Sequence, residues 1–297
     1  MSAQSNRAGI LLMIATTLVF ASQDGISRHL AAEYNTLMVV MIRYWFFAAF
    51  VVALAVKRQG GLRAAARTSQ PLLQVTRGLL LAVEICVAIW GFTLIGLVES
   101  HAIFASYPLI ITALAAPLLG EAVGWRRWAA VLAGFVGMLV ILQPGAGAFD
   151  PLALIPVASA VLFALYGLAT RFAARRDRTS TSFFYTGTVG AVVMTAVGLP
   201  AWEAMTPGDW VWMLALCVTG VLGHWLLIKC YEVAEVSVVQ PFAFFHQVFA
   251  ALVGIFVFSE ALRANVALGA SIILAAGVFA LWRAHRAAQA EDRLPKG

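Results

Sequence analysis

The sequence carries little charge. Only 11% of its 297 residues are charged, whereas 62% are hydrophobic, and the mean hydropathy is +0.89. Soluble domains contain about one quarter charged residues, and a chain of this length could not bury so much apolar surface in water. The composition therefore excludes an ordinary soluble protein and indicates that the solvent is a lipid bilayer.

Motifs of the common pump and enzyme classes are missing from the sequence. Without a GxxxxGK[ST] loop, ATP-driven pumping would need another subunit, and neither HExxH nor GxSxG is present. The three cysteines (Cys86, Cys217 and Cys230) lie in apolar runs without metal-ligand spacing, so they are interpreted as small core residues. We expect no cofactor or metal. An intramembrane enzyme, a sensor or a channel is a weaker hypothesis than a carrier.

Long apolar runs fill most of the chain. A membrane-spanning helix needs about 20 mainly apolar residues, and turn or charge signals such as QPGAG and RRDRTST separate the runs. The first run is full length and lacks a cleavage site, so it is taken as the first span. The sequence predicts an all-α integral membrane protein with spans at 8–32, 36–56, 72–95, 98–119, 125–143, 151–173, 182–199, 208–231, 236–258 and 264–283.

Basic residues are distributed unevenly between the predicted loops. Lys and Arg accumulate in cytoplasmic loops. If the N-terminus is inside, 15 Lys and Arg fall on inner segments and only Arg28 and Arg263 on outer ones. This predicts a multi-pass protein with both termini in the cytoplasm. The bias also accounts for the net charge of +6 without a nucleic-acid partner.

The chain contains an internal repeat. Residues 90–123 align with residues 229–262 at a constant offset of 139, which pairs Glu121 with Glu260. Upstream, Phe20–Ala21 corresponds to Phe163–Ala164. We interpret residues 1–147 and 148–286 as two five-helix repeats, followed by a cytoplasmic tail at 287–297. An odd number of spans inverts the second repeat, and inverted repeats are a transporter architecture with a substrate site near the midplane.

Three segments carry a resemblance to a known family. LLGEAVGW and VFSEALRA, which follow the fourth span of each half, resemble the EamA-type transporters of the drug/metabolite transporter superfamily. VEICVAIWGF is similar to the third span of YddG-type exporters of aromatic and other amino acids. The resemblance implies a ten-helix fold and a central cavity. It also implies alternating-access export of amino acids and related small metabolites across a bacterial inner membrane, with cationic drugs or other metabolites as the alternative cargo.

Ionisable residues at membrane depth are the first candidates for a substrate site, because lipid exposure of a charge costs about 2.5–3.5 kcal/mol. Glu84 lies in the middle of the third span, and His224, His246 and Gln247 fall at a similar depth in two spans of the other half. We interpret them as a patch for a zwitterion, with Glu84 binding the amino group. The alternatives are that these residues only join helices, or that Glu84 carries protons.

Further candidate contacts are ring-bearing residues. His101 and Tyr107 belong to the fourth span beside Pro108, which can kink the helix. Trp90 belongs to the third span, and Phe244 shares a helical face with Gln247. The alternative for each of these residues is packing without ligand contact.

Four charged residues are assigned structural or gating roles. Asp24 and Arg43 each lie about eight residues, or roughly 12 Å, from the outer ends of neighbouring spans, which predicts a salt bridge or an outer gate. Glu121 and Glu260 precede the fifth and tenth spans, where a carboxylate meets unpaired amides. The glycine patterns AGFVG and LGASIILAAG predict close helix packing in a monomer, with a dimer as the alternative.

Overall fold

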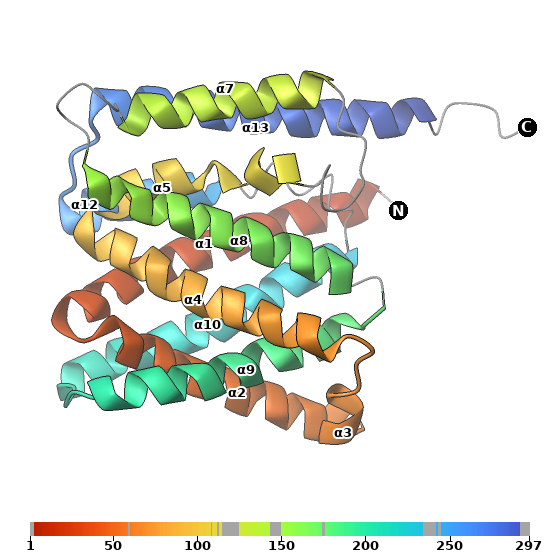
Figure 1. Ribbon diagram of the computed structural model, residues 1–297, viewed down its shortest axis with the longest axis vertical. Coiled ribbons are helices and arrows are strands. Elements are labelled where there is room, and N and C mark those ends of the chain that lie inside the picture. Colours follow the sequence, from red (N-terminus) through yellow and green to blue (C-terminus); the bar gives the residue numbers. More distant parts are fainter. Residues whose placement is uncertain are drawn as a thin grey trace, which may run out of the picture.

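The computed structural model describes residues 3–58, 60–107, 109–111, 113–114, 125–142, 150–173, 176–233, 242 and 245–291. No strand occurs among these residues, which form helices and their connections (Figure 1). The α-helices are α1 (Ala3–Glu33), α2 (Thr36–Arg58), α3 (Leu62–Ala65), α4 (Pro71–Leu94), α5 (Leu97–Phe104), α7 (Trp125–Leu142), α8 (Leu154–Ala173), α9 (Thr179–Gly198), α10 (Pro207–Val233), α12 (Phe245–Phe258) and α13 (Ala264–Glu291). Short 3₁₀ helices precede α8 (η1, Pro151–Ala153) and follow α9 (η2, Leu199–Ala201).

Six helical segments in the described ranges are long and apolar enough to cross a bilayer. They are Ala8–Glu33, Thr36–Lys57, Pro71–Leu94, Pro151–Thr170, Ser180–Ala201 and Pro207–Leu227. Each coincides with a predicted span to within a few residues. Shorter apolar helical segments lie at the other four predicted positions, at Leu97–Ile111, Leu132–Leu142, Phe245–Phe258 and Ala264–Ala276. An all-helical, multi-pass membrane fold is therefore confirmed.

Proline and glycine set several helix boundaries. Pro71 occupies the first turn of α4, where its missing N–H has no helical partner to lose. Gly96 joins α4 to α5 with φ of 90°, a left-handed conformation that glycine adopts without strain. Before η1, the Asp150 carboxylate accepts a hydrogen bond from the backbone N–H of Leu152.

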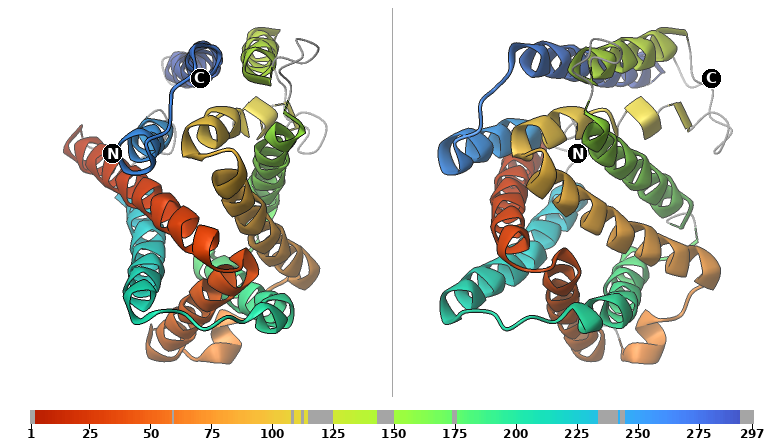
Figure 2. Two further views of the ribbon diagram at one scale, coloured as in Figure 1. Left: turned by 90° about the vertical axis from the view of Figure 1, so that its left-hand side faces the viewer. Right: turned by 60° about the vertical axis from the view of Figure 1, so that its left-hand side comes forward.

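The most extensive helix contacts join elements from the two halves of the chain. They pair α1 with α10, α7 with α13, α2 with α9, α4 with α8, α1 with α12 and α4 with α9, and α5 also packs on α12. The α7–α13 pair lies at one edge of the molecule and the α2–α9 pair at the opposite edge (Figure 2). The remaining pairs fill the space between these edges, so the residues that face the centre come from both halves.

The helices pack through two main apolar clusters. The larger includes Met38, Tyr44 and Leu216, and the second includes Ile103 and Ile273. In the second, α7 and α13 approach closely at glycines. A Cβ atom at Gly137 would lie 2.8 Å from the carbonyl oxygen of Gly269, so this approach requires glycine. The small residues predicted to allow close helix packing do so here.

Candidate functional site

A central cavity of about 370 Å³ lies among α1, α2, α4, α5, α8, α10 and α12. Its described walls carry three charged side chains outside the histidines: the carboxylates of Asp24 and Glu84 and the guanidinium of Arg43. Three histidines and several aromatic rings complete the lining. The cavity thus combines apolar walls with a few polar groups, as small-molecule sites do.

Glu84 projects from the middle of α4 toward α8. Its side chain is 5% exposed, and its Oε1 accepts a 2.8 Å hydrogen bond from the Ser159 hydroxyl. A buried carboxylate is costly unless its oxygens are paired. One neutral hydroxyl satisfies only part of this requirement, so Glu84 keeps acceptor capacity toward the cavity.

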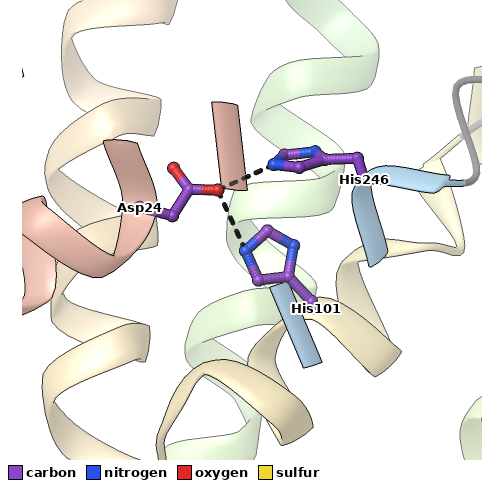
Figure 3. Close-up of side chains that lie close together, drawn as sticks. All are labelled: Asp24, His101 and His246. Carbon is purple, nitrogen blue, oxygen red and sulfur yellow. Dashed lines mark hydrogen bonds and ion pairs between the residues drawn. The ribbon is translucent and has the colours of Figure 1, made fainter. Parts of the chain in front are cut away.

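Asp24 meets two histidines in the same cavity (Figure 3). Its Oδ2 lies 2.8 Å from Nε2 of His246 and 3.1 Å from Nε2 of His101. The three side chains come from α1, α12 and α5, respectively. The His101 contact is close but poorly aligned, so neither ring nitrogen of His101 makes a hydrogen bond within the described structure.

Arg43 and His224 form another part of the cavity wall. The His224 ring stacks on Phe47 with centroids 5.6 Å apart and an interplanar angle of 5°, and Phe20 meets it edge-on at 5.3 Å. These rings fix the orientation of His224. Arg43 has no ion-pair partner among the described residues, so its guanidinium is available to an anionic group.

Aromatic rings line the side of the cavity formed by α5 and α8. Phe163 meets Tyr107 edge-on at 4.9 Å and lies 5.4 Å from Phe104. Phe92 of α4 stacks on His101 at 5.1 Å with an interplanar angle of 14°. These rings give the cavity flat apolar surfaces beside its charged groups.

The structure brings most of the sequence-predicted residues together. Glu84, His101, Tyr107, His224 and His246 all line the cavity, together with Asp24 and Arg43.

Two predicted contacts do not reach the cavity, and two lie outside the described residues. Trp90 is 41% exposed, because it occupies the outward face of α4. Gln247 is buried, and its Oε1 has no hydrogen-bond partner among the described residues. Neither lines the cavity. The structural description does not extend to Phe244 and Glu121.

The predicted Asp24–Arg43 salt bridge is replaced by a different arrangement. Similar depth places two residues at one level but does not fix the direction in which each helix turns its side chains. Asp24 faces α5 and α12, where it pairs with the histidines.

Glu260 also has a different role from the one predicted. It accepts hydrogen bonds from the backbone N–H groups of Leu97 (2.9 Å) and Val98 (2.8 Å) and pairs with Arg28. Glu260 therefore caps the start of α5 rather than the start of its own following helix, α13. The Glu260 carboxylate does lie at a helix N-terminus, as predicted, but that helix, α5, belongs to the other half of the chain.

Sequence reasoning missed Ser159 and Phe163 as cavity residues. Phe163 had a usable signal, because the repeat aligns it with Phe20 and both rings line the cavity. No sequence signal marked Ser159 as a cavity residue, because serine is common in apolar helices.

A second buried polar cluster, the Arg77 cluster, lies apart from the cavity. Arg77 is 2% exposed and donates to Gln74 Oε1 (2.6 Å) and Thr170 Oγ1 (2.9 Å). Gln74 in turn donates to Asp177 (2.8 Å) and Ser182 (3.1 Å). Partial burial tends to raise the pKa of Asp177, but hydrogen bonds from Thr68, Gln74 and Ser69 outweigh it and hold the pKa below its usual range.

A helical membrane protein with a polar cavity between its two halves has the architecture of a membrane transporter. The sequence profile of the EamA-like transporter family matches residues 7–143 and again residues 151–282. The chain belongs to this family, and it is therefore a multi-pass membrane transporter.

Named relatives cover nearly the whole chain. A riboflavin transporter of Vibrio cholerae is 29% identical over 274 residues, 91% of this chain and 92% of the relative. An S-adenosylmethionine uptake transporter of Rickettsia prowazekii is 25% identical over 274 residues, 92% of each chain. One solved crystal structure superposes with a TM-score of 0.63 at 18% identity, covering 96% of this chain and 99% of the other. That likeness concerns the fold alone.

Proposed function

We propose that the protein is a secondary carrier for small metabolites that join an amino-acid group to a flat aromatic ring. It moves them across a bacterial inner membrane by alternating access. The observation that carries this proposal is the cavity in which Glu84 and Arg43 lie among aromatic walls. Arg43 forms no ion pair with a described residue, and Glu84 has one neutral hydrogen-bond partner in the described structure.

The charges of the cavity match a zwitterion. Glu84 is placed to accept hydrogen bonds from an ammonium group, and Arg43 is placed to bind a carboxylate. Charge-assisted hydrogen bonds of this kind are about twice as strong as neutral ones. Aromatic amino acids fit this pattern, as the sequence resemblance implied. S-adenosylmethionine, the compound named for several relatives, also joins an amino-acid group to an aromatic base.

The size of the cavity favours a cargo larger than most free amino acids. Pockets for drug-sized ligands measure about 300–1,000 Å³, and the cavity of about 370 Å³ falls within this range. The rings of Tyr107, Phe104 and Phe163 give such a ligand a surface to stack on.

Riboflavin is a second candidate cargo, because relatives carry that name at 29% identity. Its ring system would use the same aromatic walls, and its hydroxyl groups would use Gln23, Ser27 and Ser100. Each of these three has a buried oxygen without a hydrogen-bond partner in the described structure, and each lines the cavity. Riboflavin lacks an amino group, so it would not depend on the charge of Glu84.

Ten spans in two inverted repeats are part of the proposal. Two matches to one family profile, at 7–143 and 151–282, support duplication. The helix contacts support it as well: α1 packs on α10 and α4 on α8. If α1 corresponds to α8 and α4 to α10, each of these contacts is the repeat image of the other, as a two-fold relation requires.

A contact between α1 and the end of α12 supports alternating access. Just beyond Ser27, Arg28 pairs with Glu260 and lies over the Phe258 ring, with its guanidinium carbon 4.1 Å from the centroid. This group joins α1 to the end of α12. With the N-terminus inside, as the basic residues predict, this contact lies on the outer side. We propose that opening this contact starts the outward-facing state.

Uptake into proteoliposomes tests the function. Purified protein should accumulate labelled tryptophan, phenylalanine or S-adenosylmethionine saturably, and an internal pool should accelerate uptake by exchange. Riboflavin uptake alone would shift the cargo to the second candidate. Absence of uptake of the whole panel by verified folded protein would overturn the proposal. A carrier runs downhill in either direction, so export in the cell requires only an outward gradient.

A further inference from the structure

We propose that Asp24, His101 and His246 form a binding site for one divalent transition-metal ion, such as Zn²⁺ or Co²⁺. This site is distinct from the Glu84 and Arg43 contacts proposed for the cargo.

The donor atoms already converge. One oxygen of Asp24 and one nitrogen of each histidine lie within 4.8 Å of one another. In a tetrahedral zinc site the ligand atoms lie about 2.0–2.2 Å from the metal, which separates neighbouring donors by roughly 3.3–3.6 Å. The observed O–N distances of 2.8 Å and 3.1 Å are a little shorter than that separation. Small side-chain rotations would therefore open a position for the ion between the three donors.

The donor set has the chemistry of a transition-metal site. Two imidazoles and one carboxylate on one side of an ion, with open positions on the other, form a known arrangement for divalent first-row metals. Here the open side would face the cavity that all three side chains line.

Within the described residues, one histidine of the cluster also lacks hydrogen-bond partners. His101 is 2% exposed, and both of its ring nitrogens lack a hydrogen-bond partner in the described structure. The two imidazoles give Asp24 polar contacts through one nitrogen each. The described part of the cavity lining contains two carboxylates and one guanidinium. A proton would neutralise one charge through a single donor atom, whereas a divalent ion would use all three.

Affinity should be moderate rather than that of a permanently held metal. Metal-bound histidines usually donate their second ring N–H to another group, and loss of that partner costs about 10–100-fold in affinity. His101 has no such partner among the residues that the structure describes. The ion should therefore exchange with the solution and be removable by a chelator.

Binding would connect the two halves of the chain. Asp24 and His101 lie on α1 and α5, whereas His246 lies on α12. If the carrier works by moving the halves, which rests on the proposed function, the bound ion should hold them together and inhibit transport. Metal binding itself does not depend on that function.

Cobalt titration of the purified full-length protein tests the site directly. The protein would be placed in lipid nanodiscs after removal of any histidine tag. Co²⁺ should produce saturable visible absorption at one ion per chain, and Zn²⁺ should displace it. Asp24→Asn and His246→Gln should each weaken binding at least tenfold. His224→Gln is the matched control, because His224 lines the same cavity outside the cluster.

The outcomes separate cleanly. Lack of saturable Co²⁺ and Zn²⁺ binding by folded wild-type protein would overturn the metal site. Wild-type affinity in both cluster variants would also overturn it. If a variant fails to remain monodisperse, the wild-type stoichiometry and the unaffected His224→Gln titration still decide. Metal binding without uptake of any cargo would leave this site standing and overturn the carrier. Uptake of a cargo without metal binding would support the carrier and overturn the metal site.

Discussion

The Arg77 cluster and the cavity cluster around Asp24 and Glu84 are both buried and polar, but they differ in completeness. Arg77 donates hydrogen bonds to Gln74 and Thr170, and Gln74 donates hydrogen bonds to Asp177 and Ser182. In the cavity, His101 lacks hydrogen bonds to the described residues, and Glu84 accepts one from a single described hydroxyl. Buried polar groups are expensive when unsatisfied.

We attribute this difference to two roles: the Arg77 cluster stabilises the fold, whereas the cavity cluster can bind a ligand. A network whose donors and acceptors are matched stabilises the helix packing and has nothing left for a ligand. A cluster with unused capacity beside a cavity costs stability, and the missing interactions are those that a ligand can provide. Substitutions in the two clusters should therefore have different effects on transport and on stability.

Glu84→Gln should produce the largest loss of transport. The substitution keeps the shape but removes the charge that we propose binds the cargo's amino group. Loss of one partner of a buried charge pair costs about 2–5 kcal/mol, so uptake of amino-acid cargo should fall by about 30-fold or more. Expression and thermal stability should stay near wild type. Normal uptake by this variant would remove Glu84 from the site.

Arg77→Met should produce the largest loss of stability. It leaves Gln74 Oε1 and Thr170 without their donor, at about 1–3 kcal/mol per unsatisfied group. The melting temperature in detergent should fall clearly, while uptake per folded molecule stays near wild type. The melting temperature of Arg77→Lys, which keeps the charge, should lie between those of wild type and Arg77→Met. If Arg77→Met kept its stability but lost transport, the structural role assigned to Arg77 would be contradicted.

Ser159→Ala should have a moderate effect confined to transport. The variant removes the 2.8 Å hydrogen bond that orients Glu84, which is worth about 1 kcal/mol, or about fivefold in apparent cargo affinity. The apparent KM should rise for tryptophan more than for riboflavin. Equal changes for both cargoes would argue against a specific contact between Glu84 and an amino group.

Asp177→Asn should produce the smallest effect, visible mainly as a changed pH dependence. The folded-state pKa of Asp177 lies below its ordinary value of 3.8. Its stabilising contribution is therefore present above that value and is lost as the pH falls below it. Wild type should lose slightly more stability than Asp177→Asn between neutral pH and about pH 3. Parallel pH–stability curves would contradict this prediction.

Much of the helical framework was predictable from the sequence, because hydropathy measures the length of a span directly. Depth along a helix was predictable too, which is why Glu84, His224 and His246 were expected at one level and do line one cavity. Helix rotation was not predictable. Asp24 pairs with two histidines instead of Arg43, and Trp90 faces outward.

Contacts between distant segments could not be predicted from the sequence either. Glu260 caps α5 across the two halves of the chain, and Ser159 binds Glu84 from α8. Both depend on how the halves pack, which no local pattern encodes. The repeat alignment held a partial signal, since it paired Phe20 with Phe163 and both line the cavity.

Competition between tryptophan and its analogue lacking the amino group tests the central claim most directly. The assay would measure inhibition of labelled S-adenosylmethionine or tryptophan uptake by each compound in wild-type and Glu84→Gln proteoliposomes. The account predicts that tryptophan competes much better than the deaminated analogue in wild type, and that this preference disappears in the variant. Equal competition by both compounds in wild type would contradict the assignment of Glu84 as the residue that recognises the amino group.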